Sequence, residues 1–257
     1  MGALHDGHRN LIRLTNERTD VSVVSVFVNP TQFGPGEDLA TYPRDQAADV
    51  DVCVAEGVDY LFLPEVEEIY PPGGSTFVKV DGLSDRHEGA SRPGHFQGVA
   101  TVVTKLLNIV EPHVIAFGQK DAQQVAVVER LVTDLSLDVE IEILPTVRDA
   151  DGLALSSRNR YLSEEERTAA TAIVRALEAA QHRVDDGEFD AEKIVEAART
   201  VIDSEPLLRV DYLNLVDRKT FLSVDALTEE ALLIVAVHCG TTRLLDNALL
   251  SPTVGNA

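Results

Sequence analysis

The first half of the chain alternates short apolar runs with stretches of helical periodicity. Residues 21–28 are apolar on both faces, as a buried parallel strand requires. Further strands are predicted at residues 60–63, 114–117 and 139–144. One helix is predicted before the first strand, over residues 10–15. Three more are predicted between the strands: one from a cap at Asp45 to Ala55, one over residues 99–110, and one that contains Gln123 and Gln124. This alternation predicts an α/β protein with a doubly wound, mostly parallel sheet.

The pattern changes near Val147. Ser163 precedes three glutamates that suit the first turn of a helix, and Ala-rich periodicity continues to Arg183. The elements predicted after it are a helix ending at Ile202, strands over residues 210–216 and 232–237, and a polar turn and tail over residues 240–247. We therefore predict two domains, residues 1–146 and residues 147–257, the second a smaller α+β domain.

The charge balance narrows the classes of partner. The chain has 257 residues, 44% of them hydrophobic, and its 22 Lys and Arg against 43 Asp and Glu give a net charge of −21. Such acidity argues against a nucleic-acid partner, because phosphate backbones demand clustered cations. Cys53 and Cys239 lie in apolar runs without metal-ligand spacing, which predicts buried thiols and no metal site. Without a signal-peptide pattern or a membrane-spanning run, we expect a cytoplasmic protein that binds no membrane.

The first chemical signal is a pair of histidines at the start of a predicted helix. Only Asp6 and Gly7 separate His5 from His8. Unpaired backbone N–H groups and the helix dipole favour an anion there, and imidazoles can stabilise charge that grows on a phosphate. Two ordinary surface histidines near a turn would give the same spacing, so other segments must decide between these interpretations.

Polar side chains also follow the predicted strands. Asn29 and Gln32 come after the strand at residues 21–28, where a doubly wound sheet gathers its ligands. The prolines and glycines around them would suit a plain turn, which leaves Gln32 unexplained. Lys120 follows the strand-terminal Gly118 and can meet phosphate oxygens as a mobile point charge. Asp121, beside it, could equally be only a helix N-cap.

Two loops add candidate ligand contacts. Arg92 and His95 precede a predicted helix, although a single histidine at a helix entrance is more often structural. The loop from Leu155 contains Ser156, Ser157 and Arg158, whose hydroxyls, N–H groups and guanidinium can clamp a triphosphate.

These features together resemble one family. The matching motifs are Met1-Gly2-Ala3-Leu4-His5-x-Gly7-His8, Phe27-Val28-Asn29-Pro30-x-Gln32-Phe33, Arg92-Pro93-x-His95-Phe96-x-Gly98-Val99, Phe117-Gly118-x-Lys120-Asp121-x-Gln123-Gln124, Ser156-Ser157-Arg158-Asn159-Arg160-Tyr161-Leu162 and Thr241-Thr242-Arg243-Leu244-Leu245-Asp246-Asn247. In this order and spacing they resemble the pantothenate synthetase family, in the adenylate-forming branch of the nucleotidyltransferase superfamily. The resemblance spans the whole chain.

The resemblance implies a Rossmann-like fold and an ATP-dependent ligase. Such an enzyme joins pantoate to β-alanine through a pantoyl adenylate and releases AMP and pyrophosphate. It also implies that Mg²⁺ bridges the phosphates of ATP and that the protein is a homodimer.

The resemblance further implies roles for individual residues. His8 would be the proton donor and His5 its phosphate-binding partner, with Lys120 and Arg158 as further catalytic cations. Arg158 would stand in a mobile loop of the kind that carries a KMSKS-type motif in class I synthetases. Pantoate would be held by Gln32 and Gln124, with Asn29 helping. The implied ATP-binding residues are Met1, Gly2, Ala3, Leu4, His5, Asp6, Gly7, His8, Gly118, Gln119, Lys120, Asp121, Val147, Leu155, Ser156, Ser157 and Arg158.

Two departures from the family stand out. Gln119 replaces the usual glutamate, which removes one carboxylate from the ATP loop. The family also carries a strand that ends just before the position of Met1, and such a fold needs that strand at the centre of the sheet. We therefore expect a sheet without its first strand, a native product that begins upstream, and low stability and activity of the 257 residues alone.

Two rival interpretations remain open from the sequence. A nucleotidylyltransferase of the same superfamily would use the same histidine pair to transfer AMP or CMP to a phosphorylated small molecule. Gln32 and Gln124 favour an uncharged, hydroxyl-bearing acid over such a second phosphate. A truncated, non-catalytic nucleotide-binding protein is the other alternative.

Overall fold

The computed structural model describes residues 1–252 and divides into two compact units. Unit 1 comprises residues 1–119 and 123–147, and unit 2 comprises residues 120–122 and 148–257. The chain thus changes unit after Val147, close to the predicted change of pattern, while the short segment Lys120–Ala122 packs with unit 2. No helix within residues 1–252 combines the length and apolar character needed to cross a membrane.

Unit 1 contains two pairs of parallel strands. Its strands are β1 (Val23–Ser25), β2 (Tyr60–Phe62), β3 (Val114–Gly118) and β4 (Glu140–Leu144). β1 pairs with β2 and β3 pairs with β4, and within residues 1–252 no strand ladder joins the two pairs. β1 is shorter than predicted, and Val21 and Val23 are exposed instead of buried. Phe27 N still donates to Met1 O (2.7 Å), so hydrogen bonding continues beyond β1.

The helices of unit 1 alternate with these strands. They are α1 (Asp6–Asn16), α2 (Gln46–Ala55), α3 (Val66–Ile69), α4 (Glu88–Ser91), α5 (His95–Val110) and α6 (Ala122–Asp134), with short 3₁₀ turns η1 (Pro30–Gln32), η2 (Asp38–Ala40), η3 (Leu83–Asp85) and η4 (Gln119–Asp121). The predicted cap at Asp45 is confirmed, since its carboxylate accepts from Ala48 N at 3.0 Å. α5 begins at His95, one turn earlier than predicted, because Gly94 in the left-handed conformation starts the helix there.

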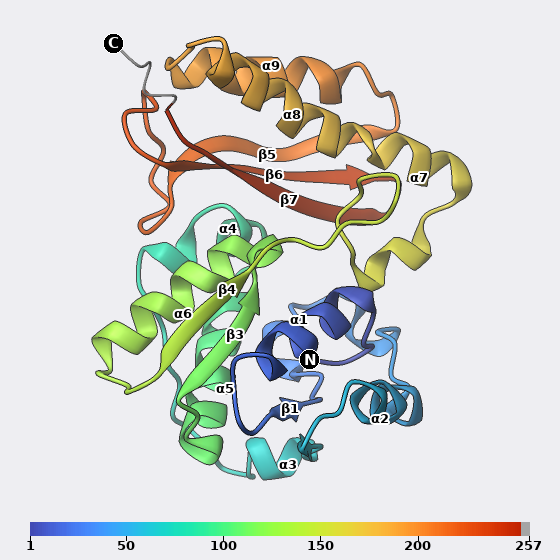
Figure 1. Ribbon diagram of the computed structural model, residues 1–257, viewed down its shortest axis with the longest axis vertical. Helices are drawn as coiled ribbons and strands as arrows, with labels where there is room; N and C mark the ends of the chain where they lie inside the picture. The colour runs from blue at the N-terminus through green and yellow to red at the C-terminus, as the bar shows by residue number, and fades with distance from the viewer. Residues whose placement is uncertain (253–257) are drawn as a thin grey trace. The chain divides into compact units, whose positions relative to one another are not determined.

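Unit 2 is a helix-covered antiparallel sheet. Its elements are η5 (Ser157–Tyr161), α7 (Glu164–Ala170), α8 (Ala172–Asp185), α9 (Ala191–Asp203), β5 (Leu208–Asp217), β6 (Ala231–Cys239) and β7 (Thr242–Leu250). The strand order is β5-β6-β7, and α8 and α9 cover one face of the sheet (Figure 1). Ser163 caps α7 in a reciprocal arrangement with Glu166, and the single helix predicted to Arg183 is two helices that meet at Thr171. The core of this unit packs Ile194, Leu233 and their neighbours in one cluster.

One prediction for unit 2 was wrong. Residues 240–247 were expected to form a polar turn and tail, but Thr242–Leu250 is the edge strand β7, paired in register with all of β6. Asp246 and Asn247 are poor strand formers, which hid the strand in the sequence. Both side chains are buried here, so tertiary contacts outweigh their weak propensity.

Candidate active site

The histidine pair forms a double cap at the start of α1. Gly7 N donates to His5 Nδ1 at 3.2 Å, and His5 N donates to His8 Nδ1 at 3.3 Å. The two ring centroids lie 4.1 Å apart. Two of the N–H groups that a helix start leaves unpaired are therefore satisfied by imidazole nitrogens. The spacing of His5 and His8 thus serves to cap α1, in addition to any role in binding a phosphate.

The double cap sets the tautomer of both rings. A nitrogen that accepts an N–H bond carries no proton, so a neutral His5 or His8 keeps its proton on Nε2. Each Nε2–H is a hydrogen-bond donor at the far side of the ring from the cap. Donors of this kind, beside a helix N-terminus, suit an anionic phosphate.

Asp49 fixes the backbone that leads into the histidine turn. Its carboxylate on α2 is buried, with Oδ2 accepting from Ala3 N at 3.1 Å and Oδ1 accepting from Leu4 N at 2.7 Å. Ala3 has φ of 52°, a left-handed conformation that costs free energy for a residue with a Cβ. Two charge-assisted hydrogen bonds to one carboxylate hold this strained segment in place.

Asn29 and Gln32 lie together in one partly buried network. Asn29 Nδ2 donates to Gln32 Oε1 at 3.2 Å and to Gly98 O at 3.1 Å. Tyr70 OH donates to Asn29 Oδ1 at 2.8 Å. A Cβ on Gly98 would stand 2.4 Å from Thr31 O, so only glycine lets α5 approach this turn. Because Oε1 of Gln32 accepts from Asn29, the orientation of its amide group is fixed.

Arg92 and His95 hold the main chain of Gln32. His95 Nδ1 lies 2.8 Å from Gln32 O and Arg92 Nη2 lies 3.3 Å from it. A carbonyl only accepts, so His95 carries its proton on Nδ1, and its Nε2 accepts from Arg92 Nη1 at 3.3 Å. Burial, and then the Arg92 charge, hold the pKa of His95 below its usual value. His95 is therefore kept neutral, beside the guanidinium.

Two carboxylates surround that guanidinium. Glu37 binds Arg92 through two hydrogen bonds, at 3.0 Å and 2.6 Å, and Glu88 lies 3.4 Å from it. Burial raises the pKa of Glu37, but its hydrogen bonds to Arg92 and Gly34 and the nearby positive charge together leave that pKa lowered. The Gln32 carbonyl is thus held by a preformed ionic group.

The glutamines at the start of α6 have different surroundings. Gln123 is buried, and its amide donates to Leu83 O and Arg86 O at 2.9 Å while Oε1 accepts from Glu88 N at 3.1 Å. Gln123 is therefore a structural residue. Gln124 is half-buried, and this leaves its predicted role toward pantoate open to test.

Lys120 lies in unit 2, next to the edge strand. Its backbone O accepts from Asn247 Nδ2 at 2.9 Å, and its ammonium lies 3.6 Å from Asp121. The Lys120 side chain is 20% exposed. Asn247 comes from β7, which is 127 residues further along the chain.

The serine-arginine loop follows a hairpin held by an ion pair between Arg148 and the buried Asp246. Arg148 makes two hydrogen bonds to Asp246, at 2.6 Å and 3.1 Å, and donates to Gly152 O at 3.2 Å. Ser156 then caps η5, because its Oγ accepts from Arg158 N at 3.3 Å. The loop thus begins at a fixed point and runs into a short 3₁₀ turn.

The sequence matches the family model for pantoate-beta-alanine ligase over residues 1–249. The chain belongs to this family. It is similar to the pantothenate synthetase of Acidobacterium capsulatum, with 53% identity over 98% of this chain and 85% of that protein. The pantothenate synthetase of Roseiflexus castenholzii is 52% identical over 97% of this chain and 90% of that protein.

Solved structures of pantoate-beta-alanine ligases have the same fold. The pantothenate synthetase of Thermus thermophilus superposes with a TM-score of 0.95, at 46% identity over 98% of this chain and 91% of that one. The ligase of Francisella tularensis was solved in complex with beta-gamma ATP and beta-alanine, and it superposes with a TM-score of 0.78 at 34% identity, over 97% of this chain and 87% of that one. The predicted family, fold class and type of enzyme are therefore confirmed.

The two units divide the residues that the ligase resemblance implied. Unit 1 brings His5 together with His8, and Asn29 together with Gln32. The other implied residues of unit 1 are Met1, Gly2, Ala3, Leu4, Asp6, Gly7, Gly118, Gln119, Gln124 and Val147. The implied residues of unit 2 are Lys120, Asp121, Leu155, Ser156, Ser157 and Arg158.

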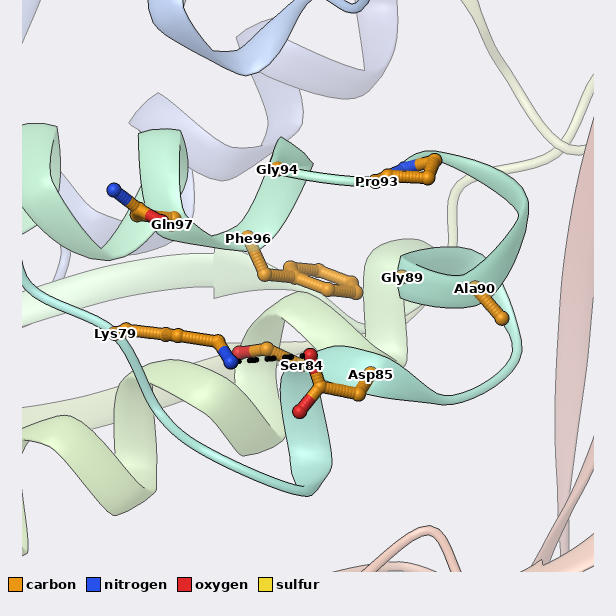
Figure 2. Close-up of a pocket in the computed structure, with 9 residues that line it drawn as sticks. All are labelled: Lys79, Ser84, Asp85, Gly89, Ala90, Pro93, Gly94, Phe96 and Gln97. Atoms are coloured by element: carbon orange, nitrogen blue, oxygen red, sulfur yellow. Dashed lines mark ion pairs between the residues drawn. The ribbon is translucent and has the colours of Figure 1, made fainter.

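A cavity of about 390 Å³ in unit 1 is lined by other residues (Figure 2). The Phe96 ring and the Lys79 ammonium border it, and Lys79 lies 3.4 Å from Asp85. None of the residues implied for ATP or pantoate is in its lining.

The sequence missed the residues that hold the site from a distance. Asp49, Asp246 and Asn247 each bind a predicted segment through backbone or ionic contacts. The sequence feature that could have pointed to them is a polar residue within an apolar stretch, such as Asp49 before Cys53 or Asp246 after Leu245. That signal marks burial but does not give the partner.

Proposed function

We propose that this chain joins pantoate to β-alanine with the consumption of ATP, as its family name describes. The observation that carries the proposal is the match of residues 1–249 to the pantoate-beta-alanine ligase family, together with relatives about 50% identical over nearly the full chain. The histidine pair supports the chemistry, because its tautomers place two donors beside a helix N-terminus.

The reaction has two steps. In the first, a carboxylate oxygen of pantoate forms a bond to the α-phosphorus of ATP, and the bond from that phosphorus to the bridging oxygen breaks, so pyrophosphate leaves. In the second, the β-alanine amine forms a bond to the acyl carbon of pantoyl adenylate, the bond to the AMP oxygen breaks, and the amine loses a proton. No protein nucleophile is needed, so the residues act by placing the reactants and stabilising charge.

In unit 1 we assign charge stabilisation to His8 and His5 and pantoate binding to Gln32, Gln124 and Asn29. The five-coordinate phosphorus of the first step spreads more negative charge over its oxygens than bound ATP does, and preplaced Nε2–H donors stabilise it. The Gln32 amide, fixed by Asn29, offers hydrogens to a carboxylate or hydroxyl oxygen of pantoate. Amide side chains suit such an uncharged, hydroxyl-bearing acid better than a second phosphate.

In unit 2 we assign phosphate binding to Lys120 and to the loop residues Ser156, Ser157 and Arg158. Lysine provides a compact positive charge and arginine a planar fork that can bind two phosphate oxygens. A protein of net charge −21 can still bind ATP through such groups, because the local field sets the potential at a site.

Three further features belong to the same proposal. Mg²⁺ would enter with ATP, bound mainly by phosphate oxygens and water, as is usual for this ion, and would neutralise phosphate charge. Among residues 1–252 there is no group of three or more His, Cys, Asp or Glu side chains that could hold a metal by itself. We also propose a homodimer, on the family resemblance, and a cytoplasmic location, since ATP is the co-substrate and both cysteines are free buried thiols.

The test follows an oxygen atom through the reaction. The chain is incubated with ATP, Mg²⁺, β-alanine and pantoate labelled with ¹⁸O in its carboxylate. We expect one labelled oxygen in AMP and one in pantothenate, because the attacking oxygen stays on phosphorus. Pyrophosphate should appear with pantoate alone in a single turnover, and AMP only after β-alanine is added. Unlabelled AMP would overturn the proposal.

The same experiment separates the rival functions. A nucleotidylyltransferase would release pyrophosphate with a phosphorylated acceptor and give no AMP on addition of β-alanine. A non-catalytic nucleotide-binding protein would bind ATP in calorimetry and release neither product. Either result with active control enzyme present would reject the ligase assignment.

A further inference from the structure

Asp246 and Asn247 are polar residues in the middle of a buried strand. Only 3% of Asp246 and 6% of Asn247 is exposed. In register with β6, they lie opposite Val235 and Ile234. Consecutive residues of a strand point to opposite faces, so the two side chains serve different partners. A polar pair at such a position costs free energy of burial unless each group is hydrogen-bonded.

This pair binds two segments to which the proposed function assigns phosphate binding, Lys120 and the hairpin before the serine-arginine loop. Asn247 Nδ2 donates to the backbone O of Lys120 at 2.9 Å. The Asp246 carboxylate accepts from Asn247 N at 2.8 Å and makes two hydrogen bonds to Arg148. The same guanidinium donates to Gly152 O, within the hairpin that leads into the serine-arginine loop.

Contacts within the hairpin carry this restraint to the loop. Asp149 N donates to Leu153 O at 2.9 Å, and Arg148 pairs with Ala154 as an antiparallel bridge. Asn159 Nδ2 donates to Ala154 O at 3.0 Å, which ties η5 back to the end of the hairpin. A shift of Asp246 would therefore move the start of residues 155–158.

We infer that Asp246 and Asn247 are positioning residues for adenylation, with Asn247 setting the main chain of Lys120 and Asp246 setting the loop that contains Arg158. This inference rests on the proposed function and adds residues to it. Asn247 touches no reacting atom by this assignment and acts through Lys120. Its effect belongs to the first step, where Lys120 meets the phosphates, and not to pantoate binding by Gln32.

The test uses Asn247→Leu, which keeps the branched shape of the side chain and removes its donor. The rate of pantoyl-adenylate formation is measured in single turnovers with ATP, Mg²⁺ and pantoate. We expect a loss of about 10- to 100-fold, because a displacement of about 1 Å in a positioned group costs that much. The KM for pantoate should stay within about threefold of the unaltered chain. The matched control is Thr242→Val, a buried polar-to-apolar change on the same strand, which should leave the rate unchanged.

A double-mutant cycle separates positioning from general damage. If Asn247 acts through Lys120, adding Asn247→Leu to Lys120→Ala should lower the rate by less than about threefold. Two losses that multiply in the double variant would overturn the inference, as would a wild-type rate in Asn247→Leu alone. Should thermal unfolding show that Asn247→Leu does not fold, Asn247→Ala replaces it in the same cycle, since it removes the donor without adding bulk or charge. An inactive unaltered chain would instead reject the proposed function.

Discussion

The candidate residues of unit 1 and of unit 2 are held in different ways. In unit 1, His5 and His8 cap one helix and bind each other's turn, and Asn29 binds Gln32 three residues away. In unit 2, Lys120 is bound by a residue from a strand 127 positions later. In unit 1 the candidate side chains pair locally, and contacts from Asp49, Arg92 and His95 support their main chain from a distance. In unit 2 both Lys120 and the hairpin before the serine-arginine loop are tied to one distant strand, β7.

This difference teaches where each kind of damage should appear. A locally held residue can be changed with a defined chemical effect, because its neighbours in the chain keep their own contacts. A residue held from a distance transmits any change in the supporting strand. Substitutions in unit 1 should therefore separate substrate binding from chemistry.

The largest effect is expected for His8→Ala. Loss of the Nε2–H donor should lower pantoyl-adenylate formation by about two to four powers of ten, the range typical of a positioned acid or base. Loss of the cap should cost only about 1 kcal/mol of folding free energy. Single-turnover kinetics and thermal unfolding measure the two quantities. His113→Ala, an exposed histidine of the same unit, is the control, and an unchanged adenylation rate in His8→Ala would remove His8 from the mechanism.

The next effect concerns the pantoate glutamines. Gln32→Ala and Gln124→Ala should each raise the KM for pantoate by roughly 5- to 150-fold, equivalent to the 1–3 kcal/mol cost of an unpaired buried group. The KM for ATP should change little. Gln97→Ala, a half-buried amide outside the assigned set, is the control. Equal loss of ATP and pantoate affinity in calorimetry would indicate general disruption of the site instead.

How far the sequence could predict the site follows from the same contrast. The histidine pair and the Asn29–Gln32 pair were found because their partners are within a few residues and belong to motifs. The positions of α2 and of the β3–β4 pair were predicted from apolar periodicity and a cap. The supporting contacts of Asp49 and Asn247 were not predicted. Their partners are backbone N–H and carbonyl groups, which every residue type has, so the sequence does not reveal them. β7 was missed for a related reason, since its central polar pair is explained only by Arg148 and Lys120.

The next prediction concerns Asp49→Ala, which removes a long-range support of the histidine turn in unit 1. Two N–H groups, those of Ala3 and Leu4, would lose their acceptor, at a cost of about 1–3 kcal/mol in the free energy of unfolding. Because Ala3 is strained, the histidine turn should shift, and adenylation should fall by about tenfold. Asp51→Ala, an exposed aspartate two residues on, should change neither quantity. If denaturant unfolding and adenylation of Asp49→Ala both match the unaltered chain, Asp49 does not support the turn.

The smallest effect is a dependence of pantoate binding on pH, carried by His95. Burial, and then Arg92, lower its pKa in the folded protein, whereas the unfolded chain takes up that proton near pH 6.5. The stability that neutral His95 contributes is therefore present above about pH 6.5 and is lost as the pH falls below that value.

When the folded protein is protonated at Nε2, two donors, from His95 and Arg92, face each other across 3.3 Å, with Glu37 and Glu88 as the other charges nearby. The Gln32 carbonyl then loses its fixed position, and the KM for pantoate should rise a few-fold toward acid pH while the KM for ATP does not. His95→Asn keeps a donor for the carbonyl and cannot titrate, so its KM for pantoate should not vary with pH in this range. Parallel pH profiles of the two proteins would show that His95 does not control the position of Gln32.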